Sequence, residues 1–250
     1  MMNKVINIKN LKYKYSDERQ ALKGLDLAIS KGESVGIIGA NGAGKSTLLL
    51  NIMGILFPSE GEILVKDIPL TKKNLPKIRE AIGMVFQNPD DQLFMTTVYE
   101  DVAFGPRNYK VPEEEVDKRV KKALETVGIS HLMDRPPYKL SGGEKGRAAI
   151  ATVLAMEPEI LIMDEPTAAL DPKSRRRLIN LLRDLGYTKI ITTHDLDMVL
   201  DLCERTIVLS DGKVVADGKT EEILRDSKLL DSCDLELPLV LQSCPICNKK

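Results

Sequence analysis

The feature that most constrains this chain is an octapeptide that matches the pattern G-x-x-x-x-G-K-[ST]. The β-branched run Ser34–Ile38 precedes it, and residues 46–56 follow as a helical stretch. Glycines let backbone amides turn inward around phosphate groups, while a helix N-terminus and a lysine add positive charge. A plain glycine-rich turn with a surface lysine accounts poorly for eight positions in register. We therefore expect a nucleotide, ATP or GTP, to be bound by Gly39, Ala40, Asn41, Gly42, Ala43, Gly44, Lys45, Ser46 and the adjoining Thr47.

The rest of the chain alternates between strand and helix patterns. Strand-like runs recur at residues 82–86, 160–163, 189–193 and 206–209, and helical patterns separate most of them. This alternation is typical of a parallel α/β sheet. Residues 5–8 and 25–29 instead read as short antiparallel strands joined by a polar turn at residues 16–18. We predict an α/β fold, a P-loop NTPase (RecA-like) core with an N-terminal antiparallel β subdomain.

Residues 88–138 lack a buried strand run and carry helix signals instead. Pro112 is expected in the first turn of a helix, with three glutamates at its positive end. Apolar residues then recur at helical spacing up to Gly128, which occupies the position of a C-terminal stop. We predict an inserted α-helical subdomain at about residues 88–138 of a domain spanning residues 1–225. A hairpin is expected at Asp211-Gly212, and residues 226–250 form a weakly patterned tail.

Composition limits the partners and the compartment. The formal net charge is −1, so no global basic field attracts nucleic acid or anionic lipid. The first residues show no signal peptide, and residues 148–156, the longest nearly apolar stretch, are too short to span a bilayer. Four cysteines do not form a secreted disulfide framework, so we expect a cytoplasmic protein that reaches a membrane only through another protein.

The last cysteines form a C-x-x-C pair, Cys244 and Cys247. Two thiolates are half of a tetrahedral zinc site, and Cys233 is the nearest further candidate ligand. A mobile end without metal is the favoured alternative.

A second motif, an acidic pair, follows the apolar run at residues 160–163. The run places Asp164 and Glu165 where open α/β sheets bind their ligands, at the carboxyl end of a strand. We expect Asp164, with Ser46, to hold Mg²⁺, and Glu165 to act as the general base toward water. Many strands simply end in charged turns, but the phosphate loop and the following Pro166-Thr167 favour the catalytic interpretation.

Between these two motifs lies Leu140-Ser141-Gly142-Gly143-Glu144, followed by a helix-like run at residues 145–156. This segment closely resembles the signature motif of ATP-binding-cassette (ABC) ATPases, and the resemblance covers nearly everything from Val5 to about Ile223. It differs at Gly146, where the family commonly has glutamine. The resemblance implies an ATP hydrolase that uses ATP and Mg²⁺.

The resemblance also assigns roles to individual residues. Tyr15 is similar to the aromatic residue that stacks on adenine, with Tyr13 as a competitor. Gln87 is similar to the glutamine that contacts Mg²⁺ and the attacking water, and His194 to the switch histidine near the γ-phosphate. With Lys45 and Glu165, these form the expected catalytic group. Asp171 is similar to the aspartate that bridges two cassettes.

By this resemblance Ser141 and the amides of Gly142 and Gly143 cap the γ-phosphate held by a facing subunit, and Glu144 belongs to the same nucleotide-binding segment. The site is then complete only in a dimer. The resemblance therefore implies a second ABC ATPase subunit, either an identical copy or a paralogue.

Residues 86–94, FQNPDDQLF, indicate which group of ABC ATPases the chain resembles. They resemble the corresponding segment of cobalt and energy-coupling-factor importer ATPases, which drive uptake of metal ions or vitamins. By this resemblance Gln92, Leu93 and Phe94 line a groove for a coupling helix of a transmembrane subunit, at the cytoplasmic face of the membrane. The alternative is that Leu93 and Phe94 pack inside the helical insert.

The sequence disfavours two other functions relative to transport. A soluble cassette ATPase acting on nucleic acid or ribosomes usually has a long coiled-coil insertion or two cassettes, whereas this chain has a compact insert and no basic stripe. We therefore expect no nucleic-acid partner. A non-hydrolysing ATP-dependent module is disfavoured by Glu165 and His194.

Overall fold

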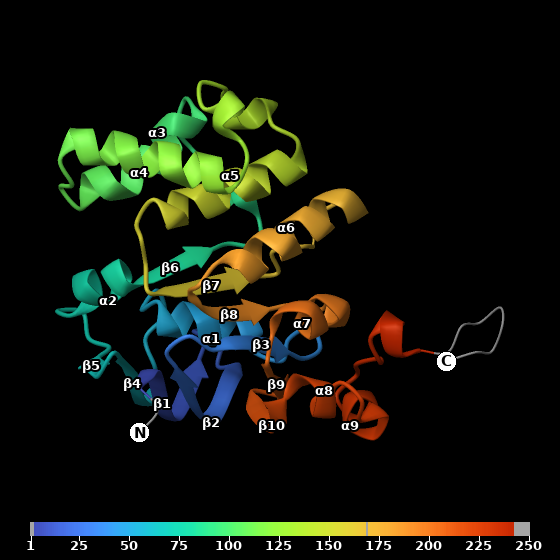
Figure 1. Ribbon diagram of the computed structural model, residues 1–250. Helices are drawn as coiled ribbons and strands as arrows, with labels where there is room; N and C mark the ends of the chain where they lie inside the picture. The colour runs from blue at the N-terminus through green and yellow to red at the C-terminus, as the bar shows by residue number, and fades with distance from the viewer. Residues whose placement is uncertain (1–2, 169, 243–250) are drawn as a thin grey trace. The chain divides into compact units, whose positions relative to one another are not determined.

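The computed structural model describes residues 3–168 and 170–242. Two compact units make up the chain (Figure 1): Met1–Arg79 with Thr188–Lys250 as unit 1, and Glu80–Tyr187 as unit 2. Each unit contains helices and strands, and the predicted α/β fold class is confirmed.

Unit 1 contains an antiparallel sheet in the order β2-β1-β4-β5. Its strands are β1 (Lys4–Lys14), β2 (Gln20–Ser30), β4 (Glu60–Val65) and β5 (Ile68–Pro69). The predicted antiparallel pair is β1 with β2, in which Ile8 faces Leu27 and both side chains are buried. The sequence analysis did not find β4, which pairs with the other edge of β1 and buries Ile63 and Val65.

A second group of strands in unit 1 positions the phosphate loop. Strand β3 (Ser34–Ile38) runs parallel to β8 (Thr188–Thr192) on one side and β9 (Arg205–Ser210) on the other. Strand β10 (Lys213–Lys219) completes the predicted hairpin with β9. The turn uses left-handed backbone at Asp211 and Gly212, with φ of 46° and 72°. Because β3 and β8 are parallel, the residues that follow them emerge at the same edge.

The helices of unit 1 are short. They are α1 (Lys45–Ile52), α7 (Leu196–Leu202), α8 (Thr220–Ile223) and α9 (Ser227–Ser232), with η4 (Leu239–Leu241) near the described end. The prediction that the first helix continues to residue 56 is wrong. Gly54 adopts a left-handed φ of 62°, and the amides of Ile55 and Leu56 both turn back to the carbonyl of Leu50. This left-handed turn closes the helix.

Unit 2 contains the parallel pair β6 (Ile82–Val85) and β7 (Ile160–Asp164) and several helices. Three of them, α3 (Val98–Asn108), α4 (Glu113–Thr126) and α5 (Gly142–Leu154), pack against one another (Figure 1). The remaining elements are α6 (Pro172–Asp184), η1 (Pro89–Asp91), η2 (Ser130–Leu132) and η3 (Pro137–Lys139), while α2 (Leu75–Ala81) lies at the boundary of the two units in the chain.

The predicted amphipathic helix is α4. Val116, Val120 and Leu124 are fully or almost fully buried, and Gly128 follows with φ of 70°. Pro112 is the residue before the helix, not part of its first turn as predicted, because its ψ of 140° is extended.

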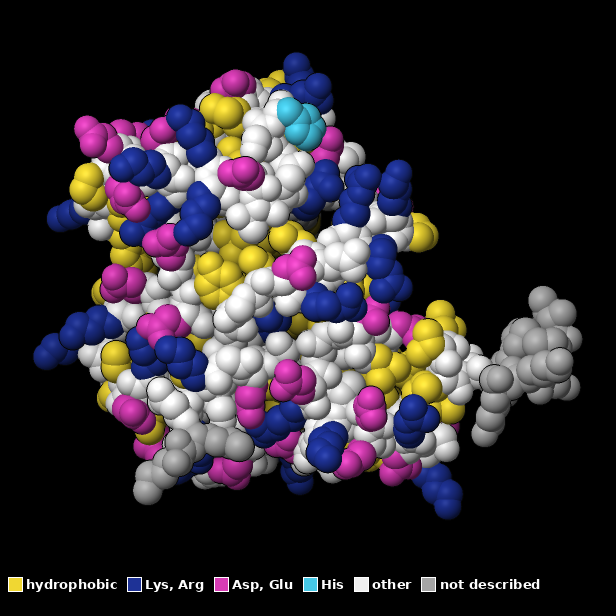
Figure 2. Space-filling model, in the orientation of Figure 1, with side chains coloured by type: hydrophobic (Ala, Val, Ile, Leu, Met, Phe, Trp, Pro, Cys, Tyr) yellow, Lys and Arg dark blue, Asp and Glu magenta, His cyan; other side chains and the backbone are white. Residues whose placement is uncertain are grey.

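The tail has more structure than its sequence pattern indicated, since α9 and η4 lie within residues 226–250. Cys233 is buried, and Cys244 and Cys247, the pair for which zinc binding is the less favoured alternative, lie outside the described residues. In the described part of the chain, no helix is long and apolar enough to cross a membrane. On the face in view in Figure 2, Lys and Arg side chains are interspersed with Asp and Glu, in keeping with the net charge near zero.

Candidate functional site

The predicted phosphate loop joins β3 to α1 in unit 1. A Cβ placed on Gly39 would lie 2.2 Å from the carbonyl oxygen of Leu209, so only glycine fits there. Gly44 has a left-handed φ of 105° and precedes α1 without a side-chain cap. The first amides of α1 therefore need an acceptor from outside the helix, and the helix N-terminus favours an anion.

Lys45 is folded into this loop. Its side chain is buried, and Nζ donates hydrogen bonds to the carbonyl oxygens of Gly39 at 2.7 Å and Ala40 at 3.2 Å. His194 follows β8, and its Nε2 lies 3.2 Å from the same Nζ. Unit 1 thus brings together two features predicted from distant parts of the sequence: the loop with its lysine, and the histidine.

Tyr15 is fixed beside the loop by a contact that sequence reasoning missed. Its hydroxyl lies 2.9 Å from Oγ1 of Thr47, which is buried on α1. The guanidinium of Arg19 lies 4.9 Å from the centroid of the Tyr15 ring, and the competing Tyr13 meets Tyr15 edge-to-face. Of the two aromatic candidates, Tyr15 is the one joined to the loop.

The predicted acidic pair lies at the end of β7 in unit 2. Asp164 and Glu165 are 7% and 8% exposed, respectively, although both carry carboxylates. Glu165 adopts a left-handed φ of 48°, a conformation that costs a non-glycine residue about 1–3 kcal/mol and clusters at functional sites. Because β6 runs parallel to β7, with Val85 opposite Met163, Gln87 leaves β6 at the same edge as the acidic pair.

A cavity of about 200 Å³ gathers several predicted residues of unit 2. Gln87, Gly142 and Glu165 all line it, together with Asp90 and Lys145. The glutamine, the signature motif and the proposed base, which are far apart in sequence, therefore share one hollow.

The signature segment forms the start of α5 as a capping box. Ser141 donates from its backbone N–H and its hydroxyl to Oε2 of Glu144, each at 2.8 Å, and the amide of Glu144 donates back to the hydroxyl of Ser141. These donors hold the pKa of Glu144 below its usual range. Glu144 thus stabilises its own helix, a role that the pattern S-x-x-E could have revealed. Ser141 and Gly142 are exposed.

Asp171 has a similar local role. It is the N-cap of α6, where its Oδ1 accepts from the amides of Lys173 and Ser174 at 3.0 and 3.1 Å. Hydrogen bonds from the side chain and amide of Ser174 lower the pKa of Asp171. The carboxylate is exposed and ionised at neutral pH.

Of the three residues expected to contact a transmembrane subunit, Gln92 and Leu93 are engaged within unit 2 and only Phe94 is exposed. The carboxamide of Gln92 is used inside unit 2, and Leu93 is buried, which agrees with the alternative for Leu93 that it packs within the insert. Phe94 is 62% exposed and stacks edge-to-face on Phe104 of α3, which is also exposed.

Asp101 of α3 was missed by sequence reasoning. Its Oδ1 accepts from the amides of Phe94 at 2.9 Å and Met95 at 3.0 Å, so it fixes the turn that presents Phe94. The carboxyl is buried, which raises its pKa, while the two amides act in the opposite direction. The available signal was only an acidic residue in a first helical turn, which is common for other reasons.

Comparison with known proteins identifies the family. The family model for the ABC transporter matches residues 22–168. The energy-coupling factor transporter ATP-binding protein EcfA of Methanocaldococcus jannaschii is 47% identical over 98% of this chain and 90% of its own length.

Two solved structures are also similar. One is cbiO1 of Clostridium perfringens, described as part of the ABC transporter complex cbiONQ, with 45% identity, a TM-score of 0.82 and coverage of 95% of this chain and 97% of that one. The other is a dimeric ATP-binding cassette in a post-hydrolysis state with ADP and phosphate, with 36% identity, a TM-score of 0.77 and coverage of 86% and 98%. This chain therefore belongs to the ABC transporter family, as an ATP-hydrolysing, ATP-binding subunit close to the cbiO and energy-coupling-factor type.

Proposed function

We propose that this chain powers an importer of the cobalt or energy-coupling-factor type, with a metal ion or a vitamin as cargo. Two cassettes close on ATP, hydrolyse it and separate, and this cycle moves a membrane partner. The ATP-binding domain spans residues 1–225, with its helical insert at about residues 88–138 and a tail at residues 226–250. The observation that carries the proposal is the exposed signature turn, Ser141 and Gly142, held rigidly at the start of α5 by Glu144.

The nucleotide is assigned to the phosphate loop. Lys45 now satisfies the loop's own carbonyl groups, and it would exchange them for the β- and γ-phosphates of ATP. Tyr15 is the residue proposed to stack on adenine, and His194 reaches the γ-phosphate from the end of β8.

The residues proposed to hold Mg²⁺ are all oxygen donors. Ser46 offers an exposed hydroxyl at the start of α1, Asp164 a carboxylate and Gln87 an exposed amide oxygen. Oxygen ligands of this kind are those that Mg²⁺ prefers, and the ion would neutralise charge on the phosphates. Glu165 polarises the attacking water as general base.

A second subunit is needed because hydrolysis requires further positive potential at the γ-phosphate. The exposed N-terminus of α5 supplies it to the ATP of a facing copy, through Ser141 and the amides of Gly142 and Gly143. Asp171 links the two cassettes. The dimeric cassette with ADP and phosphate supports this arrangement.

Phe94 and Phe104 are proposed as the contact for the membrane partner. An exposed aromatic pair is typical of a binding surface, and the turn that presents Phe94 is fixed by Asp101. That cbiO1 is part of the complex cbiONQ supports a partner of this kind.

The test is copurification of the tagged chain from membranes of cells that express it with its genetic neighbours. We expect a membrane protein to copurify with the wild type and with Val215→Glu, a control at a 48% exposed valine on β10. Phe94→Glu should reduce the copurified partner by about tenfold or more, because an interface aromatic is replaced by a charge. Equal recovery with Phe94→Glu would contradict the assigned surface, and recovery of RNA in place of a membrane protein would contradict the transport role.

A further inference from the structure

We propose that Lys145 is a positioning residue: through its ion pair with Asp90 it fastens the loop that carries Gln87 to the signature helix α5, and so couples the two nucleotide sites of the dimer. The inference rests on the proposed function, in which Gln87 serves the Mg²⁺ and attacking water of its own chain while Ser141 contacts the ATP of the facing chain. Both ends of this link lie within unit 2.

The link begins one residue after the capping glutamate of α5. Nζ of Lys145 donates to Oδ1 of Asp90 at 2.6 Å. The lysine side chain is only 20% exposed, since it lies against the cavity that Gln87 and Glu165 line. Lys145 therefore belongs to the same helical turn as the signature residues, and it reaches out of that turn to the glutamine loop.

The glutamine loop is itself closed. Asn88 caps η1, because its Oδ1 accepts from the amide of Asp90. At the far end, Oε1 of Gln92 accepts from the amide of Phe86 at 3.2 Å, which brings the two ends of the loop together. Gln87 thus lies in a short, internally bonded loop, and it cannot shift far without moving Asp90.

A second attachment prevents the loop from pivoting on the ion pair alone. The side-chain nitrogen of Gln92 donates to the carbonyl of Ala149 at 2.9 Å and to Oγ1 of Thr152 at 2.7 Å, both on α5. The loop is therefore attached to α5 at its first turn and again farther along the helix. We infer that Gln87 and Ser141 move as one body.

This attachment has a consequence for the dimer. When binding or release of ATP moves Gln87 in one site, α5 transmits the movement to Ser141, which belongs to the other site. Each site thereby senses the other, and hydrolysis becomes cooperative in ATP. The pair itself is partly exposed, so it should add little to folding stability.

The experiment compares kcat, KM and the Hill coefficient of ATP hydrolysis in the full-length dimer. Asp90→Asn and Lys145→Gln should each lower kcat by about three- to tenfold and bring the Hill coefficient toward unity. Affinity of the monomer for ATP should remain within about twofold of wild type, because neither residue contacts the chain's own nucleotide. The reversed pair, Asp90→Lys with Lys145→Asp, should recover most of the lost kcat and cooperativity.

Glu60→Gln is the matched control, since it breaks an ion pair of similar length and exposure, 2.7 Å from Lys12 to Glu60 in unit 1. It should leave kcat and the Hill coefficient unchanged. The inference is overturned if the single variants keep wild-type cooperativity. It is also overturned if the fold-decrease in kcat of the reversed pair equals the product of the fold-decreases measured for the two single variants. Failure of the proposed function would look different, because the wild-type protein itself would then stay a monomer with ATP and Mg²⁺ or copurify with no membrane protein.

Discussion

At the scale of single residues, the site is held by local hydrogen bonds. Lys45 rests on two loop carbonyls, Ser141 and Glu144 cap each other, and Asp171 caps α6. The capping bonds of Ser141 and Glu144 fix the start of α5, whose amides are the donors proposed for the γ-phosphate. The left-handed backbone of Glu165 is a further local constraint on where its carboxylate lies.

The lowered pKa of Glu144 gives a prediction about acid stability. A carboxyl whose pKa is lower in the folded state stabilises the fold above its ordinary value, here 4.5, and this contribution is lost as the pH falls through the folded-state pKa. Glu144→Gln keeps an acceptor for Ser141 but cannot titrate. It should cost about 0.5–1 kcal/mol at pH 7, the range for a weakened cap, and the difference should vanish in acid.

Urea denaturation at a series of pH values measures this effect. The free energies of unfolding of the wild type and Glu144→Gln should approach each other as the pH falls through the lowered pKa of Glu144. A stability difference that stays constant between pH 7 and pH 3 would contradict the assignment of the cap to the ionised carboxylate.

Residue roles that depend on short spacing could be predicted from the sequence. The phosphate loop, the acidic pair and the Asp211-Gly212 turn are contiguous, so their patterns are visible without the fold. The contacts of Asp90 with Lys145 and of Tyr15 with Thr47 join residues 55 and 32 positions apart, and no local pattern specifies them. For the same reason, the local sequence does not tell that Leu93 is buried and Phe94 is exposed.

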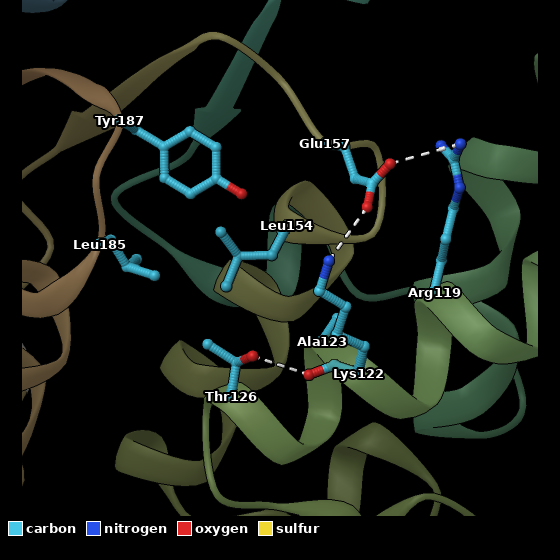
Figure 3. Close-up of a pocket in the computed structure, with 8 residues that line it drawn as sticks. All are labelled: Arg119, Lys122, Ala123, Thr126, Leu154, Glu157, Leu185 and Tyr187. Atoms are coloured by element: carbon cyan, nitrogen blue, oxygen red, sulfur yellow. Dashed lines mark hydrogen bonds and ion pairs between the residues drawn. The ribbon is translucent and has the colours of Figure 1, made fainter. Parts of the chain in front are cut away.

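At the scale of elements, ion pairs and close packing hold the helices of unit 2 against neighbouring segments of the same unit. Figure 3 shows one example, a cavity of about 150 Å³ between α4, the end of α5 and the segment before β8. Glu157, in a left-handed conformation with φ of 51°, pairs there with Arg119 and Lys122 of α4. Because Glu157 engages both cations, we interpret this cavity as a packing feature of unit 2.

Gly83 gives a sharper test of element packing. A Cβ at this position of β6 would lie 2.1 Å from Cγ1 of Val153 on α5, so the strand and helix approach each other too closely for any side chain. Gly83→Ala should therefore destabilise the protein by about 1–3 kcal/mol, the usual cost of overpacking.

Gly186→Ala is the control, since a Cβ there meets no atom within 4 Å. Thermal unfolding should show a clearly lower Tm for Gly83→Ala and a nearly unchanged Tm for Gly186→Ala. Equal midpoints would mean that β6 and α5 are not packed as described.

Element types were easier to predict than element ends. The order of strands β3, β6, β7, β8 and β9 follows from apolar runs, and the amphipathic pattern identifies α4. The end of α1 and the strand β4 were missed, because a left-handed glycine closes the first and pairing with β1 stabilises the second. The short α9 was missed for a related reason, since only Leu230 in it is buried and the apolar pattern is weak.

At the scale of the whole molecule, the central claim is that one chain holds only part of the machinery for its own ATP. The exposed signature turn and the exposed carboxylate of Asp171 are assigned to a second cassette, and the Phe94–Phe104 pair to a membrane protein. The family and its ATPase chemistry were predictable from motifs, whereas the surfaces for partners depend on which side chains the fold leaves exposed.

The most direct measurement is the mass of the protein by light scattering with and without ATP and Mg²⁺, beside its rate of phosphate release. Glu165→Gln should bind ATP, slow hydrolysis by about 10²–10⁴-fold and accumulate as a dimer with two bound ATP molecules. Adding Ser141→Arg to that variant should leave ATP bound to a monomer. If the Ser141→Arg protein hydrolysed ATP at the wild-type rate as a monomer, the claim that a second chain completes the site would be contradicted.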